Sequence, residues 1–159
     1  MRIAWLRDHP WHVDALAAAH LEAFGALVPD WSHAEAAAEL RSHTRGRAIP
    51  TTLVALGDDG GWLGSVSLLQ EDHKHIRQYS PWLATLYVRP EARGQGVGAA
   101  LVGRCVAEVA ALQVAVLYLY CTELMAAWYR RLGWRDQDLV VLGPMRLRVM
   151  SIDCMAGGA

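Results

Sequence analysis

The segment WLATLYVRPEARGQGVG, at residues 82–98, decides the fold of this chain of 159 residues. Its first part, 82–88, is almost entirely apolar, which is typical of a central strand buried on both faces. A short connection over 89–93 follows, and three glycines then alternate directly before an apolar helical pattern, at Gly94, Gly96 and Gly98. The segment therefore predicts a buried strand, a tight turn and the start of a helix.

The predicted helix leads into a second buried strand. Apolar residues recur at helical spacing over 97–112, and residues 114–120 form another run without a polar face. Because two consecutive parallel strands need a crossover connection, we expect a right-handed parallel βαβ unit here.

The flanking sequence adds the rest of a mixed α/β (α+β) fold. We expect a central mixed, mostly antiparallel sheet of about six to seven strands with about four helices, in a single domain over residues 1–159. The additional predicted strands cover 1–7, 51–56, 62–69, 139–142 and 145–150, and the additional helices cover 10–24, 32–43 and 123–131. Residues 152–159 are expected to form a flexible tail.

Composition and charge exclude several classes of protein. Hydrophobic residues make up 53% of the chain and charged residues 19%, a balance that excludes a disordered protein. The formal net charge of -1 argues against a nucleic-acid partner. The longest apolar run, 114–121, is too short to span a membrane, and charges near the N-terminus interrupt any signal-peptide core. Since the three cysteines also lack a CxxC spacing, we expect a cytoplasmic location.

The glycine turn has the chemistry of an anion site. Glycines let the backbone approach a ligand closely, and the first N–H groups of a helix have no partner within the helix. These groups also sit at the positive end of the helix dipole, which favours phosphate. Arg93 adds a fixed positive charge at the entrance to the turn.

Three kinds of phosphate-binding turn compete for this segment. A Walker loop fails because no Gly-Lys-Ser/Thr follows. A dinucleotide fingerprint fits formally as Gly94-x-Gly96-x-x-Ala99, but five residues separate it from the strand. The acidic residue that this fingerprint needs about 20 positions later would also fall in the apolar strand 114–120. The third kind, Arg-x-x-Gly-x-Gly after a buried strand, fits best.

Residues 82–133 resemble the GNAT (GCN5-related N-acetyltransferase) superfamily. The segment LYVRPEARGQGVG, 86–98, is similar to its pyrophosphate loop, and YRRLGW, 129–134, is similar to its tyrosine-bearing YxxLGF segment. The resemblance implies a parallel strand pair that splays apart at the cofactor site. It also implies an acetyl-CoA-dependent N-acetyltransferase that acts on a primary amine of a small molecule, peptide or protein.

The resemblance further implies which residues hold the co-substrate acetyl-CoA. The strand backbone at Leu86, Tyr87 and Val88 would pair with the pantetheine arm, and one of its N–H groups would steady the developing oxyanion. The turn would bind the pyrophosphate through Arg93, Gly94, Gln95, Gly96, Val97, Gly98 and Ala99. Tyr129 would be the general acid for the departing thiolate, the alternative being an ordinary half-buried tyrosine.

The acceptor site and the general base are less well defined. The segment before the buried strand offers four candidates, Glu71, Asp72, His73 and His75, although such a polar loop is usually only solvated. Two tryptophans, Trp31 and Trp82, either line the acceptor site together with Phe24 or simply pack. No metal is expected, because no third ligand joins the two histidines.

Two positions near the end of the second buried strand need separate comment. Many members of the superfamily carry asparagine seven residues before the tyrosine, whereas this chain has Thr122, which we expect to cap a helix. Cys121 is expected to be a small packed side chain rather than a nucleophile.

Two other function classes compete with the enzyme. One is a non-catalytic acyl-CoA-binding sensor or regulatory module with the same fold, which turnover against amines would separate from the enzyme. The other is a nucleotide-cofactor oxidoreductase, which the loop length and the missing acidic residue disfavour. A homodimer is also possible for either.

Overall fold

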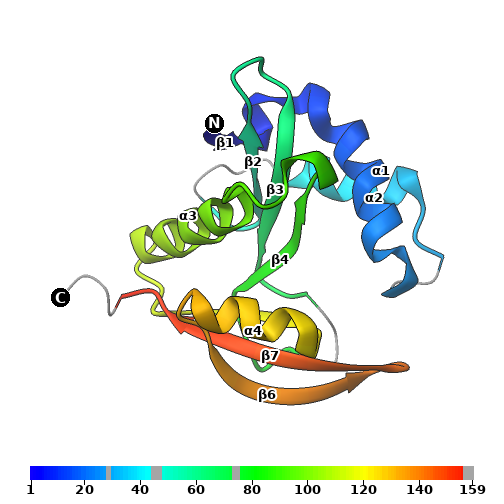
Figure 1. Ribbon diagram of the computed structural model, residues 1–159. Helices are drawn as coiled ribbons and strands as arrows, with labels where there is room; N and C mark the ends of the chain where they lie inside the picture. Colours follow the sequence, from blue (N-terminus) through cyan, green and yellow to red (C-terminus); the bar gives the residue numbers. More distant parts are fainter. Residues whose placement is uncertain (28–29, 44–47, 73–75, 156–159) are drawn as a thin grey trace.

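Seven strands and four α-helices make up the computed structural model, which describes residues 1–27, 30–43, 48–72 and 76–155 (Figure 1). The strands are β1 (Arg2–Trp5), β2 (Thr51–Leu56), β3 (Trp62–Leu69), β4 (Trp82–Val88), β5 (Val116–Cys121), β6 (Arg135–Leu142) and β7 (Met145–Asp153). The α-helices are α1 (Val13–Phe24), α2 (His33–Ser42), α3 (Val97–Ala111) and α4 (Glu123–Arg131). Short 3-10 turns cover Leu6–Asp8, Pro10–His12, Gly25–Leu27 and Pro90–Ala92.

The strands form a single sheet in the order β1-β2-β3-β4-β5-β7-β6. β4 and β5 are parallel, and the other neighbouring strands are antiparallel. The mixed, mostly antiparallel sheet and its parallel pair joined through α3 are therefore confirmed.

The parallel pair separates soon after it forms. In the described part of the chain, β4 and β5 share one register pair, Trp82 with Tyr118. A bulge then bends β4, because Ser65 pairs with Tyr87 while Ser67 pairs with Ala84. Thr85 lies in this bulge with a φ of 51°. Figure 1 shows the result: β4 runs away from the hairpin that β6 and β7 form.

The two faces of the sheet carry different helices. One apolar core lies between the sheet and α3 and α4, and includes Val66, Leu101 and Leu117. A second core lies under α1 and α2, and includes Leu16 and Val54. β4 and β5 therefore separate in a sheet that has α3 and α4 on one face and α1 and α2 on the other (Figure 1).

The C-terminal strands differ from the sequence-based prediction. β6 begins at Arg135 instead of residue 139, and β7 runs to Asp153 instead of residue 150. The predicted tail therefore starts too early, since Ile152 pairs with Leu117 and Cys154 is buried. No helix in the described ranges is long and apolar enough to cross a membrane.

Candidate functional site

The glycine turn takes the backbone conformation that its sequence predicts. Gly94 and Gly96 have φ angles of 77° and 83°, in the left-handed region where glycine is favoured. Gly96 is the N-cap of α3, and no side chain caps this helix end. A Cβ atom added at either glycine would meet no atom within 4 Å. The turn is therefore an open cradle at a helix N-terminus, which fits a pyrophosphate.

The surrounding side chains hold this cradle in place. Arg93 donates from Nε to the Val88 carbonyl at 2.9 Å, and its guanidinium lies 5.7 Å from the Tyr87 ring centre. Gln95 donates to the Glu91 carbonyl at 3.3 Å. The predicted positive charge thus stands at the end of β4, beside the turn.

The backbone of Leu86, Tyr87 and Val88 has a free edge. Tyr87 and Val88 pair with β3 on one side and Leu86 lies in the bulge beside them, while the described β4–β5 pairing ends at Trp82 on the other side. Unpaired N–H and C=O groups on such an edge can bind an extended ligand as an added strand. The edge runs directly into the glycine turn, so one ligand could use both.

Tyr129 lies in the apolar core on the α3/α4 side of the sheet. Its side chain is 6% exposed and packs edge-on against Trp128 and Trp134. Burial raises the pKa of its phenol, and the thiols of Cys121 and Cys105 raise it further. Its hydroxyl therefore stays protonated at neutral pH, as a general acid must.

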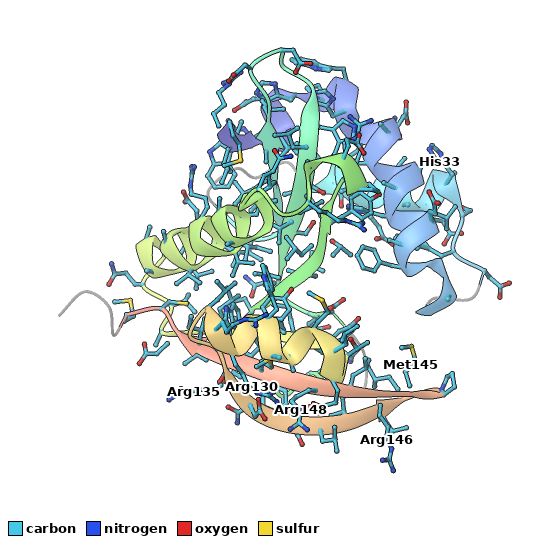
Figure 2. All side chains as sticks on the ribbon, viewed as in Figure 1. His33, Arg130, Arg135, Met145, Arg146 and Arg148 are labelled. Atoms are coloured by element: carbon cyan, nitrogen blue, oxygen red, sulfur yellow. The ribbon has the colours of Figure 1, made fainter. Side chains whose placement is uncertain are left out.

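The N-terminus of α4, the short helix after β5, is not capped as predicted. Thr122 is the N-cap of α4 but its side chain makes no capping hydrogen bond, so the predicted capping role of its hydroxyl is wrong. Its carbonyl instead accepts from the N–H groups of Met125 and Ala126. Glu123 pairs with Arg130 of α4 and with Arg148 of β7, two arginines that are labelled in Figure 2, and these ion pairs account for it without a catalytic role.

Cys121 is half-buried, and its thiol lies 3.8 Å from the sulfur of Met150. Burial raises the pKa of this thiol to about 11, so it is a poor nucleophile at neutral pH.

On the α1/α2 side, aromatic rings gather where β4 and β5 part. Trp82 is fully buried, and its ring centre lies 6.0 Å from those of Tyr118 and Tyr120. Its indole N–H has no hydrogen-bond partner among the described residues. Burial raises the pKa of the Asp72 carboxyl and the neighbouring Tyr120 hydroxyl lowers it, so the loop before β4 lies near this cluster.

The other predicted acceptor residues are only partly brought together. Trp31 donates from Nε1 to Glu39 Oε1 at 3.2 Å, so it reaches α2 rather than Trp82. Glu71 is exposed and pairs with Arg77 at 3.6 Å. Phe24 packs against His20 at 5.9 Å. His73 and His75 lie outside the described residues.

The sequence analysis did not single out Glu39 or Tyr120 as site residues, although both affect the pKa of Asp72. Burial raises the pKa of Asp72 to about 6, the hydrogen bond from Tyr120 lowers it, and the charge of Glu39 raises it. Glu39 and Tyr120 therefore belong to the same neighbourhood as Asp72. No spacing in the sequence links these three, because each comes from a different element.

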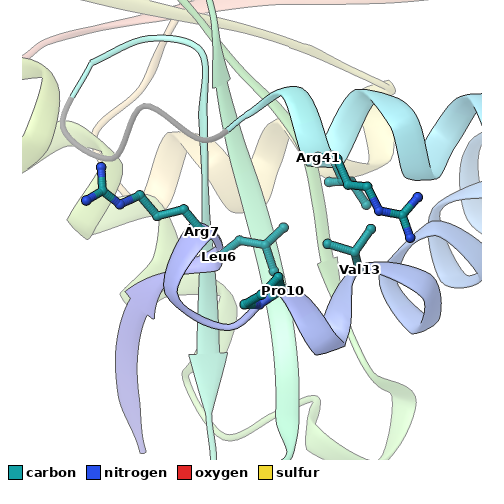
Figure 3. Close-up of a pocket in the computed structure, with 6 residues that line it drawn as sticks. Leu6, Arg7, Pro10, Val13 and Arg41 are labelled. Atoms are coloured by element: carbon teal, nitrogen blue, oxygen red, sulfur yellow. The ribbon is translucent and has the colours of Figure 1, made fainter.

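A small cavity elsewhere does not bring predicted site residues together. It lies between the N-terminal segment, α1 and α2 (Figure 3), and is lined by Leu6, Arg7, Pro10, Val13, Leu40 and Arg41. Among the described residues, no group of three or more His, Cys, Asp or Glu side chains could hold a metal ion.

Comparison with known proteins agrees with this geometry. A family model described as an acetyltransferase (GNAT) domain matches residues 50–136. No curated protein sequence matches the chain. Among solved structures, an aminoglycoside 6'-N-acetyltransferase complexed with coenzyme A aligns with a TM-score of 0.76 at 15% identity, over 97% of each chain.

Two further structures extend the comparison. A nourseothricin acetyltransferase aligns with a TM-score of 0.56 at 26% identity, over 69% of this chain and 68% of that one. A ribosomal-protein-alanine N-acetyltransferase from Brucella melitensis aligns with a TM-score of 0.74 at 20% identity, over 96% of this chain and 99% of that one.

Taken with the fold, these matches define an acetyl-CoA-dependent N-acetyltransferase. The chain belongs to the GNAT acetyltransferase family, whose domain covers more than half of its length.

Proposed function

We propose that this enzyme transfers the acetyl group of acetyl-CoA directly to a primary amine, in a ternary complex with Tyr129 as the general acid. The observation that carries the proposal is the opening between β4 and β5. A free strand edge and an uncapped helix end meet there, and the buried phenol of Tyr129 belongs to the core on the α3/α4 side of the sheet.

Each part of the opening has a role in this reaction. The edge at Leu86–Val88 would hold the pantetheine arm, and the turn at Gly94–Ala99 would hold the pyrophosphate. Acetyl-CoA supplies the thioester whose carbonyl carbon forms the new bond to nitrogen as its bond to sulfur breaks. The Tyr129 hydroxyl would give its proton to the departing sulfur, and the amine would lose one proton to become the amide nitrogen.

The acceptor is an amine whose class is open within this proposal. The similar structures are named for aminoglycoside, nourseothricin and ribosomal-protein-alanine acetylation. The proposal therefore covers an amine of a small molecule as well as an amine of a peptide or protein. A cytoplasmic location, a possible homodimer and the absence of nucleic-acid and membrane partners stay predictions from the sequence.

Calorimetric titration tests the cofactor half of the proposal. We expect acetyl-CoA to bind the purified protein and NAD not to bind. Preference for NAD would favour the oxidoreductase instead, and no binding of acetyl-CoA at millimolar concentration would contradict the proposal.

Release of the CoA thiol during incubation with a panel of amines tests the transfer half. We expect turnover with at least one primary amine, and none without an amine beyond slow hydrolysis. Tight binding without turnover across the panel would instead favour the non-catalytic sensor.

A further inference from the structure

The last residues of β4 have a fixed position on the β3 side. The N–H of Arg89 donates to the Leu63 carbonyl at 2.8 Å, and Gly64 lies opposite Val88 in the register. A Cβ atom added at Gly64 would lie 2.6 Å from the Tyr87 carbonyl oxygen, so the two strands approach closely here. This end of β4 is therefore held against the rest of the sheet.

The carbonyl of Val88 points to the opposite, free edge of β4. In a trans peptide the C=O and the following N–H point in opposite directions, and the following N–H, that of Arg89, points to β3. The Val88 oxygen is thus one of the groups that an added strand would use along the free edge. It is also the acceptor of the Arg93 side chain, whose Nε donates to it at 2.9 Å.

A second contact fixes the guanidinium of Arg93 at the end of β4. Its Cζ atom lies 5.7 Å from the centre of the Tyr87 ring, within the range of a cation–π contact. The Tyr87 ring packs in turn against Trp62 at 5.9 Å and against His20 of α1 at 6.4 Å. Arg93 is therefore anchored to the face of the sheet that α1 covers, whereas the glycine turn opens at the start of α3, which packs on the other face.

An arginine beside a phosphate-binding turn can also act through its charge alone, and a lysine can serve that purpose as a point charge. The contacts of Arg93 use properties that lysine lacks. They need a flat group that stacks on a ring and an Nε donor that is aligned with a carbonyl at the same time. The geometry therefore favours a role in the position of the strand.

We infer that Arg93 is a positioning residue for the pantetheine arm, which it serves by holding Val88 and Tyr87 so that the free edge of β4 keeps the shape that binds the arm. It acts through the strand and not by contact with the pyrophosphate. A carbonyl oxygen has two lone pairs, so the bond from Nε leaves the Val88 oxygen able to accept from an amide of the arm as well. The inference rests on the proposed function, since it presupposes that acetyl-CoA binds along this edge.

The test separates the two halves of CoA. CoA and its nucleotide half, adenosine 3'-phosphate 5'-diphosphate, which contains the pyrophosphate but no arm, are titrated into the protein by calorimetry. The Kd of the nucleotide half divided by the Kd of CoA measures what the arm contributes. We expect Arg93→Gln to reduce this ratio about tenfold, the usual contribution of a hydrogen bond from a charged group. Its affinity for the nucleotide half should stay within about threefold of the wild-type value, which also verifies folding.

A second variant and a matched control refine the test. Arg93→Lys keeps the charge but not the flat group, and we expect it to lose the contribution of the arm as Arg93→Gln does. The control is Arg104→Gln. Arg104 also donates from Nε, to Glu108 at 2.8 Å, and lies 5.7 Å from the ring centre of Trp5, but these contacts involve neither β4 nor the glycine turn. It should bind both ligands as the wild-type protein does.

Hydrogen exchange in the free protein supplies a readout that needs no ligand. The amide of Arg89 should exchange about threefold faster, or more, in Arg93→Gln than in the wild-type protein, because the strand end is held less firmly. An unchanged exchange rate would count against the inference.

The titrations can overturn the inference in two ways. An equal loss of affinity for CoA and for the nucleotide half in Arg93→Gln, restored in Arg93→Lys, would show a direct contact with the pyrophosphate. Unchanged binding of both ligands in Arg93→Gln would show that the side chain has no role in binding. Failure of the wild-type protein to bind CoA would instead contradict the proposed function itself, and the inference with it.

Discussion

At the scale of single residues, Tyr129 tests the proposed chemistry most directly. We expect Tyr129→Phe to lower kcat by roughly 10²-fold or more, the usual contribution of a general acid. The ring packing against Trp128 and Trp134 stays possible, so the melting temperature should change little. The control is Tyr79→Phe, which removes a hydroxyl that donates to Asp138 on β6 at 2.9 Å and that has no role in the proposed proton transfer. A kcat near the wild-type value in Tyr129→Phe would remove the tyrosine from the reaction.

His20 and Asp72 are expected to give stability two opposing pH dependences. Burial lowers the pKa of His20 to about 4, so the unfolded chain binds more protons and stability falls as pH drops from about 6.5 to 4. Burial raises the pKa of Asp72 to about 6, so the folded chain binds more protons and stability falls as pH rises from about 4 to 6. The two slopes largely offset one another in the wild-type protein.

Single variants should expose each slope. In Asp72→Asn, the free energy of unfolding should increase with pH between 4 and 6.5 by at most roughly 3 kcal/mol. In His20→Gln, it should instead decrease between pH 4 and 6 by a similar amount. Urea unfolding at several pH values measures both, and slopes of the same sign in the two variants would contradict the assignment.

The glycine turn and the surroundings of Asp72 differ in how far the sequence could predict them. Gly94 and Gly96 need positive φ, a local property that the sequence itself carries. Glu39 and Tyr120 both affect the pKa of Asp72 although the three come from different elements, and each has an ordinary local explanation on its own element. Asp72 was one candidate among four loop residues, while Glu39 and Tyr120 carried no signal.

At the scale of elements, the turn before α3 can be tested with matched glycines. Gly96→Ala forces a side chain into the left-handed region, at a cost of about 1–2 kcal/mol, and places a methyl group in the open cradle. We expect its affinity for CoA to fall at least about tenfold. Calorimetry with CoA measures this effect.

Gly60→Ala is the control for that experiment. Gly60 has a φ of 82°, and a Cβ atom added there would also meet nothing within 4 Å, but it lies in the turn between β2 and β3. We expect Gly60→Ala to lose as much stability as Gly96→Ala but to keep the wild-type affinity for CoA. Equal CoA binding by Gly96→Ala and Gly60→Ala would mean that the turn serves only to start the helix.

Element boundaries show the same division between local and tertiary causes. The predicted ranges of β2, β3, β4 and α4 match the structure, because apolar runs, turn residues and helix ends mark them clearly. β6 was predicted too short, since its first four residues, Arg135–Asp138, are polar. They join the sheet by pairing with β7 across an irregularity between Asp136 and Asp138.

At the scale of the whole molecule, the sheet consists of two parts with a narrow link. Strands β1–β4 form one part and β5, β7 and β6 form the other, and the described residues of β4 and β5 share one register pair. A ligand bound along the free edge of β4 would lie between the two parts. We therefore expect CoA to couple them, in addition to stabilising the protein by mass action, which gives about 2.7 kcal/mol at 100 times Kd.

Hydrogen exchange with and without saturating CoA measures this coupling. Because the ligand contacts the edge of β4 and the glycine turn, amides of residues 86–88 and 94–99 should be protected beyond the general stabilisation. Amides of β1, at the far edge of the sheet, should gain only that general protection. Protection confined to 94–99 would leave the phosphate site in place but would show that the β4 edge does not bind the pantetheine arm, and the two parts of the sheet would then stay uncoupled by the ligand.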